Sequence, residues 1–90
     1  MLKILEDLIL LARTRKKNPV KDSYTNRLLD SSTLAKEKVI EEINELIEAV
    51  EKDSNKIHEA ADVFYHLIMY LEKNDIDVED VMKELENRRK

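Results

Sequence analysis

Two pairs of acidic residues, each pair three positions apart, are the side chains of this sequence best suited to chemistry. Glu42 and Glu45 form the first pair, and Glu59 and Asp62 form the second. In a helix this spacing places two side chains on adjacent turns of one face. Two antiparallel helices would therefore bring four carboxylates together across one groove. Because like charges repel, such a cluster needs a compensating cation.

A divalent cation is the compensation that these ligands favour. The sequence contains no cysteine, and oxygen ligands without thiolates select a hard ion, Mg²⁺ or alternatively Mn²⁺. Magnesium keeps several waters and often shares its shell with substrate phosphates, which predicts phosphate chemistry. The competing interpretation is that acidic pairs only line solvated helix faces, as they do in many charged helices. Glu59 and Asp62 fit that interpretation less well, because their helix is expected to be buried.

The segment around Glu59 and Asp62 has apolar residues on all sides. Its main stripe at helical spacing, which predicts a core face that includes Phe64, consists of Ile57, Ala60, Ala61, Phe64, Leu67, Ile68 and Leu71. Its back is also largely apolar, which is typical of a buried helix. We expect a second copy of the chain to cover that back, with the interface close to Glu59 and Asp62. His66 on this side is expected to be a hydrogen-bonded structural residue rather than a base, and His58 to lie on the surface.

The elements that must position the acidic pairs are helices. We expect a first helix over 1–16 and a short helix over 24–29 that is capped by Asp22 or Ser23. A long helix should follow and end at 52, with Ser32 or Thr33 as its cap. A further helix should cover 56–74, and the last should begin after Asp77. The long helix has its own apolar stripe from Val39 to Val50. The fold class is therefore all-α: a small antiparallel helical bundle of four main helices, completed by homo-oligomerisation.

Composition limits the remaining possibilities. The chain has 90 residues, enough for one domain over 1–90, and it has no glycine and one proline. Its formal charge of −4 gives no electrostatic basis for binding nucleic acid. No apolar run has membrane-spanning length, and the N-terminal segment lacks a signal-peptide core, so we expect a soluble, cytoplasmic protein.

Four segments in order resemble phosphoribosyl-ATP pyrophosphatases, within the all-α nucleotide pyrophosphohydrolase (MazG-like) superfamily. Along the chain they are "NPVKDSYTNRLL", "KVIEEINELIEA", "HEAADVFYHLIMYL" and "IDVEDVMKELENRR". The resemblance covers nearly the whole chain. It implies Mg²⁺-dependent hydrolysis of the α–β phosphate bond of phosphoribosyl-ATP to phosphoribosyl-AMP and pyrophosphate, the second step of histidine biosynthesis. It also implies a nucleotide substrate and a homodimer or dimer of dimers.

Residue by residue, the resemblance also implies roles in the site. The metal ligands would be Glu42, Glu45, Glu59 and Asp62. Glu41 becomes a further catalytic acid, either a ligand or a base for the attacking water. The substrate-binding residues would be Ser23, Tyr24 and Thr25, which contact phosphate or ribose, and Arg13 and Lys38, which contact phosphate. Arg13 belongs to a basic stretch up to Arg27 that either complements a helix dipole or faces an anionic substrate.

The sequence departs from the family pattern in two places. Ile40 stands where the family has glycine before the paired acids, and the glycine expected after the Ser-Tyr-Thr helix is absent. These changes bear on how closely the loop wraps the substrate, because glycine allows a close backbone approach. The family often carries a second, zinc-dependent domain, so this chain would be the stand-alone form. Two alternatives stay open: a house-cleaning nucleoside triphosphate pyrophosphohydrolase, and a non-enzymatic helical dimerisation module.

Overall fold

The computed structural model describes residues 2–89, and every regular element in that range is a helix. The helices are α1 (Lys3–Lys17), α2 (Tyr24–Asp30), α3 (Ser32–Lys52), α4 (Lys56–Lys73) and α5 (Val78–Arg88). The all-α prediction is confirmed. Met1, where the first helix was expected to begin, lies outside the described residues. None of the helices in this range is long and apolar enough to cross a membrane.

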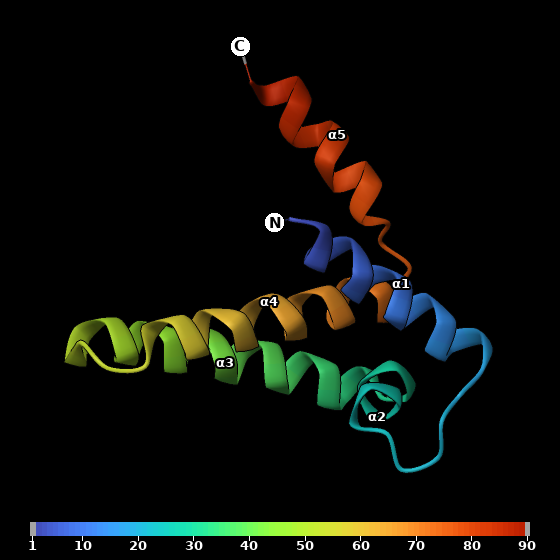
Figure 1. The fold of residues 1–90 in the computed structure, drawn as a ribbon, viewed down its shortest axis with the longest axis horizontal. Coiled ribbons are helices and arrows are strands. Elements are labelled where there is room, and N and C mark those ends of the chain that lie inside the picture. The colour runs from blue at the N-terminus through green and yellow to red at the C-terminus, as the bar shows by residue number, and fades with distance from the viewer. Residues whose placement is uncertain (1, 90) are drawn as a thin grey trace.

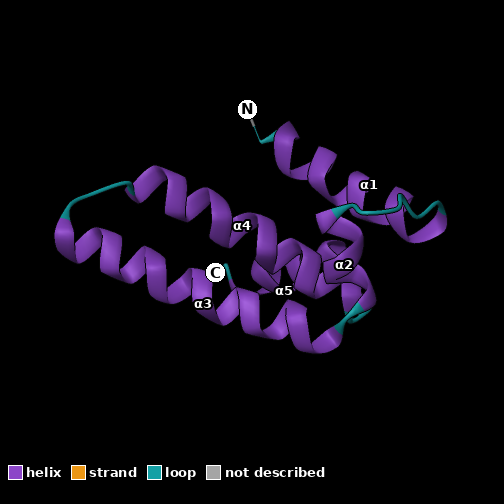
Figure 2. Ribbon diagram, turned by 90° about the horizontal axis from the view of Figure 1, so that it is seen from below, coloured by secondary structure: helices purple, strands orange, loops and turns teal. Residues whose placement is uncertain are grey.

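Helices α3 and α4 form a long antiparallel hairpin, and the other helices gather around one end of it (Figures 1 and 2). The hairpin has the most extensive helix–helix contact in the chain. Its turn is short because Asp53 and Asn55 both adopt left-handed backbone conformations, with φ of 53° and 49°. This turn fixes the register between the two acidic pairs.

The core lies where α1, α2 and α4 meet. Its buried residues are Ala12, Leu28, Leu29, Ile68 and Met69, and Leu5, Leu8, Ile9, Leu34 and Tyr65 pack against them. Each of these residues removes apolar surface from water, which is the main force that holds the three helices together. The core therefore anchors the last part of α4, whereas the acidic residues lie nearer the hairpin turn.

The prediction for the main apolar stripe of α4 is wrong for the single chain. Phe64 is 54% exposed and Ile57 is 87% exposed, whereas Met69 on the opposite side is fully buried. The stripe on α3 is exposed as well, at Ile40, Ile43, Ile47 and Val50. The reason is that α4 turns the side carrying Met69 and His66 toward the core, so only Ile68 of the predicted stripe is buried and its first part remains free.

The helix ends show how the sequence specifies the boundaries. Ser23 caps α2, as expected, and its side-chain oxygen accepts a hydrogen bond from the Asn26 amide. Ser31 caps α3, so the predicted cap at Ser32 or Thr33 is wrong by one or two residues. Helix α5 contains no buried residue and projects away from the hairpin (Figure 1). It therefore does not join the others in a closed bundle within one chain.

Candidate metal and nucleotide site

The hairpin brings the acidic residues into two compact groups. One group consists of Glu41, Glu42 and Glu45 on α3, and the other of His58, Glu59 and Asp62 on α4. Within each group, one ligand atom from each residue lies within 4.8 Å of the others. A divalent cation needs ligand atoms at about this spacing. The spacing of three residues therefore brings the paired carboxylates close together on each helix, as predicted.

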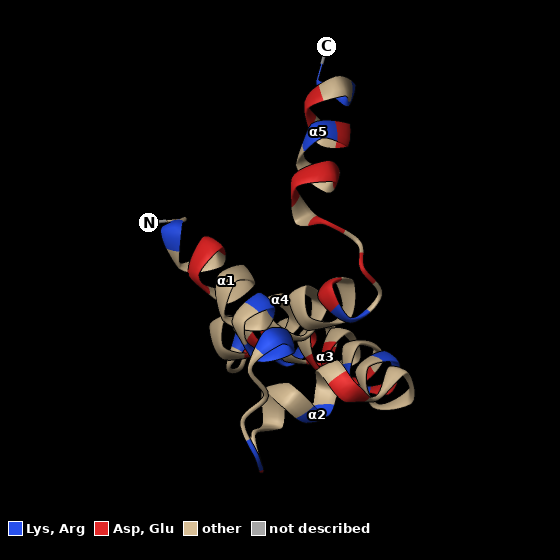
Figure 3. Cartoon of the chain, turned by 90° about the vertical axis from the view of Figure 1, so that its right-hand side faces the viewer, with Lys and Arg blue, Asp and Glu red and all other residues tan. Residues whose placement is uncertain are grey.

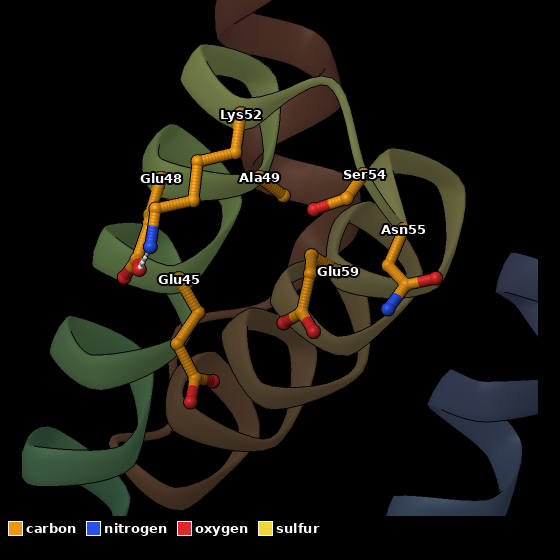
Figure 4. A pocket seen from close by; sticks show the side chains of 7 residues that line it. All are labelled: Glu45, Glu48, Ala49, Lys52, Ser54, Asn55 and Glu59. Atoms are coloured by element: carbon orange, nitrogen blue, oxygen red, sulfur yellow. Dashed lines mark hydrogen bonds and ion pairs between the residues drawn. The ribbon is translucent and has the colours of Figure 1, made fainter.

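The two groups face each other across the hairpin. Glu45 and Glu59 line the same pocket, which lies between α3 and α4 near the turn. Their side chains extend from opposite walls toward the same gap (Figure 4). Lys52 lines this pocket as well, but it is paired with Glu48. The pocket thus has carboxylates on both walls.

Glu42 is the most unusual member of the site. It is only 6% exposed, and its Oε2 atom is buried without a hydrogen-bond partner. The Oε2 atom of Glu59 is buried without a partner too. An unsatisfied buried polar atom normally costs a protein free energy, so such atoms mark sites where another group completes the bonding.

The pKa of Glu42 is raised from 4.5 to about 7, most of all by burial and then by the adjacent carboxylates of Glu45 and Asp62. Lys38 opposes this shift. Because Asp62 is on the other helix, its contribution means that the two acidic groups interact across the hairpin. The chain alone therefore leaves negative charge uncompensated, and a divalent cation is the group that this donor set fits.

Lys38 borders the acidic groups. Its Nζ atom lies 3.2 Å from Oε2 of Glu41 and 3.8 Å from Oε1 of Glu42. The hydrogen bond to Glu41 raises the pKa of Lys38, so its amine stays charged. Glu41 itself is half exposed, with 52% of its side chain in solvent. Lys38 and Glu41 therefore form an accessible pair at the edge of the cluster.

An aromatic group also borders the site. The Tyr24 hydroxyl lies 2.9 Å from Nε2 of His66, whose Nδ1 lies 2.8 Å from the carbonyl oxygen of Asp62. Since a carbonyl only accepts, Nδ1–H is the donor there, and Nε2 is the ring nitrogen paired with the Tyr24 hydroxyl. Both ring nitrogens of His66 are thus engaged, which agrees with the expected structural role. Burial raises the pKa of the Tyr24 phenol.

The residues beside Tyr24 serve the fold. Ser23 caps α2 and also accepts a hydrogen bond of 2.7 Å from Nη1 of Arg15. Thr25 is buried, and its hydroxyl is hydrogen-bonded to that of Tyr65. The ring of Tyr24 stacks on that of Tyr65, with 6.4 Å between centroids. The Ser-Tyr-Thr segment therefore lies next to the acids, with Tyr24 as its exposed member.

Arg13 is not brought to the acidic groups. Its guanidinium makes two hydrogen bonds to Glu72 and two to Glu79. Glu72 follows Asp62 by ten positions on α4, which corresponds to about 15 Å along the helix. Lys16 also binds this end of α4 through the Glu72 carbonyl. These contacts join α1 to the end of α4 and, through the Arg13–Glu79 pair, to the start of α5. Figure 3 shows the basic segments of α1, in blue, where this helix lies against α4.

The sequence analysis placed His58 on the surface, and 71% of its side chain is indeed exposed. The structure nevertheless groups it with Glu59 and Asp62, since its Nε2 lies 3.4 Å from Oδ2 of Asp62. The signal that could have revealed this is its spacing of four from Asp62, because residues four apart are neighbours on a helix.

The chain matches the profile of one protein family, described as phosphoribosyl-ATP pyrophosphohydrolase, over residues 5–89. A similar protein is the phosphoribosyl-ATP pyrophosphatase of Clostridium acetobutylicum, which is 42% identical over 94% of this chain and 80% of its own length. The phosphoribosyl-ATP pyrophosphatase of Haloarcula marismortui is 35% identical over 96% of this chain and 93% of its own length.

A third relative is larger. The histidine biosynthesis bifunctional protein HisIE of Pyrococcus furiosus is 40% identical over 99% of this chain. The chain spans only 43% of that protein's length. The similarity to the bifunctional protein thus concerns one part of it. No solved structure matches the chain.

Proposed function

Since the chain belongs to the phosphoribosyl-ATP pyrophosphohydrolase family, we infer that it is a hydrolase of histidine biosynthesis that acts on phosphoribosyl-ATP. Water attacks at the α–β phosphate linkage, the anhydride bond breaks, and phosphoribosyl-AMP and pyrophosphate leave. The observation that best supports a phosphate site here is the buried carboxylate of Glu42, which lies among other acids and has one oxygen without a partner.

We propose that the site binds Mg²⁺, with Mn²⁺ as an alternative. The residues that would hold it are Glu42, Glu45, Glu59 and Asp62. The donor set fits, because it consists of carboxylate oxygens on facing helices and two of those oxygens are buried without a partner. When bound, the cation neutralises phosphate charge and lowers the pKa of a water.

The chain's own residues would orient and activate the reactants. Glu41 is the accessible acid of its group, so we propose that it either accepts the proton of the attacking water or adds a ligand. Lys38 would release Glu41 and contact a phosphate oxygen, because it is a charged amine at the edge of the cluster. Burial of the Glu42 carboxylate keeps water away from one side of the reaction.

The Ser-Tyr-Thr segment would contact the nucleotide. Tyr24 is its exposed aromatic residue, and the guanidinium of Arg27 lies 5.5 Å from the centre of the Tyr24 ring. A base or ribose could pack beside this pair, while Ser23 and Thr25 hold the segment in place. A phosphate contact from Arg13 would require that residue to leave Glu72 and Glu79, so Lys38 is the stronger candidate.

We also propose a homodimer or a dimer of dimers in the cytoplasm. An apolar groove between α1 and α4 is lined by Ile4, Leu5, Leu8, Ile57, Ala60, Ala61 and Phe64. Exposed apolar area of this kind is a usual site of protein association. Because Ala60 and Ala61 lie between Glu59 and Asp62 in sequence, the partner would come close to the acidic site.

The decisive experiment measures pyrophosphate release from phosphoribosyl-ATP, with and without Mg²⁺, beside dUTP, dCTP and ATP. We expect release from phosphoribosyl-ATP alone, with loss of activity in Glu59→Gln. Release from a nucleoside triphosphate instead would keep the metal site and assign the chain to house-cleaning hydrolysis. No release from any of these substrates by a folded protein would leave a helical association module.

A further inference from the structure

We propose that His58 supplies a nitrogen ligand at the edge of the acidic site and thereby shifts the metal preference of this chain from Mg²⁺ toward Mn²⁺. The proposal deepens the metal site of the proposed function and depends on it. It concerns a residue that none of the roles above includes.

The geometry places His58 within reach of a cation held by α4. Its ligand atom lies within 4.8 Å of those of both Glu59 and Asp62. The separation of 3.4 Å between its Nε2 and Oδ2 of Asp62 is long for a good N–H···O hydrogen bond. It is compatible with two ligands that share one ion.

Two buried oxygens without a hydrogen-bond partner indicate a ligand at this place. The Glu59 Oε2 atom is buried and has no partner, although its residue neighbours His58 directly. Across the hairpin, the Glu42 side chain is 92% buried and also has an unpartnered oxygen.

The remaining explanation for His58 is an exposed ion pair with Asp62. Its side chain is 71% exposed, so such a pair would be weak and screened by salt. The same exposure allows the ring to rotate toward an ion at little cost. The two explanations predict different donor atoms around a bound metal ion, because only a ligand role would add the His58 nitrogen to the carboxylate oxygens.

Nitrogen donors discriminate among divalent ions. Carboxylates and water suit Mg²⁺ and Mn²⁺ alike, whereas imidazole adds affinity for transition ions and little for Mg²⁺, which prefers oxygen. A site with His58 should therefore bind Mn²⁺ more tightly, relative to Mg²⁺, than the same site without it.

The test compares the natural chain with His58→Gln, using Mn²⁺ alone as the probe. Electron paramagnetic resonance reports free Mn²⁺, and competition gives the Mg²⁺ affinity. We expect Mn²⁺ affinity to fall about tenfold in His58→Gln and Mg²⁺ affinity to change less than about twofold. The nitrogen coupling in the spin-echo spectrum of bound Mn²⁺ should disappear in the variant. Lys56→Gln, at an exposed position two residues earlier, should retain the coupling and both affinities.

The outcomes separate this inference from the proposed function. If the natural chain binds both ions and His58→Gln retains both affinities and the nitrogen coupling, the His58 ligand is overturned and the carboxylate site stands. Equal losses for Mg²⁺ and Mn²⁺ would mean that His58 only positions Asp62, which also overturns it. If the natural chain binds neither ion, the metal site of the proposed function falls as well. Melting temperatures without metal verify that the variants are folded.

Discussion

Of the glutamates that the structure describes, Glu42 and Glu72 are the two that are buried, with 6% and 3% of their surface exposed. Glu42 lies in the middle of α3, whereas Glu72 lies at the end of α4. Both oxygens of Glu72 accept hydrogen bonds from Arg13, at 3.3 Å and 3.2 Å. Glu42 lies among acids, has one oxygen without a partner, and has a lysine only at 3.8 Å from the other.

This difference separates a carboxylate that the chain satisfies from one that the chain leaves incomplete. Glu72 is satisfied by the chain itself, so its burial joins α1 to α4. Glu42 is not satisfied by the chain, so its burial makes sense if something outside the chain completes it. Degree of burial alone would treat the two alike, and only the partners distinguish them.

The largest expected effect concerns catalysis. Glu42→Gln should lower kcat/KM for phosphoribosyl-ATP by at least about 100-fold, because it removes a charged ligand from the site. Glu72→Gln, the matched substitution, should stay within about twofold per folded molecule. Steady-state pyrophosphate release measures both. Equal losses in the two variants would remove the distinction between the two glutamates.

The pH dependence of stability should expose Glu42 next. Because its pKa in the folded chain is raised from 4.5 to about 7, protonation favours folding. This stabilisation is complete below pH 4.5 and is lost as pH rises to 7, by at most about 3 kcal/mol. Urea unfolding without metal, from pH 4.5 to 8, should show that decline.

Two additions sharpen the pH experiment. Glu42→Gln should flatten the decline, because its amide does not titrate. Mg²⁺ should stabilise the natural chain more at pH 8 than at pH 5, since ligands bind a metal in their deprotonated form. A decline that is unchanged in Glu42→Gln would assign the pH dependence to other groups.

Replacement of Glu72 should destabilise the folded chain, in contrast to replacement of Glu42. Glu72→Gln removes a charge that Arg13 satisfies, so the free energy of unfolding at pH 7 should fall by about 1–3 kcal/mol. Urea unfolding at pH 7 measures the change. Glu42→Gln under the same metal-free conditions should be neutral or stabilising, because it relieves repulsion. A stabilised Glu72→Gln variant would contradict the structural role.

The smallest effect should come from Glu79 on α5. Its hydrogen bonds with Arg13 lower its pKa to about 2, so its contribution is present above pH 4.5 and is lost as pH falls toward 2. Glu79→Gln should lower the melting temperature slightly at pH 7 and not at pH 2. The pair is exposed, so added salt should reduce the difference. A large effect would mean that α5 is held more firmly than its exposure indicates.

The sequence predicted the helices well because their ends carry local signals. Ser23 follows a turn and precedes a helical pattern, and it caps α2 as expected. The acidic pairs were also predictable, because spacing along one helix determines which side chains are neighbours. Even the error at the start of α3 is small, since Ser31, Ser32 and Thr33 can all serve as caps and the sequence does not choose between them.

The side of a helix that meets the core was not predictable, and neither were pairs of residues far apart in the sequence. Helix α4 is apolar on nearly all sides, so its pattern does not tell which side meets the core, and Phe64 was placed wrongly. Arg13 was expected at a phosphate, but its partner Glu72 is 59 positions away in sequence. The predicted bundle of four main helices implied that the last helix packs against the others, yet α5 has no buried residue in the single chain.

The absence of glycine at the left-handed positions of the hairpin turn and elsewhere affects the native state and the unfolded chain in opposite ways. Within residues 2–89, the positions with positive φ are occupied by Asp22, Asp53, Asn55 and Asp75, because the sequence has no glycine. Each costs on the order of 1 kcal/mol of backbone strain in the native state. The same absence of glycine narrows the range of conformations open to the denatured ensemble, so less entropy is lost on folding. Replacing Asn55 with glycine would relax the turn and, at the same time, enlarge that ensemble.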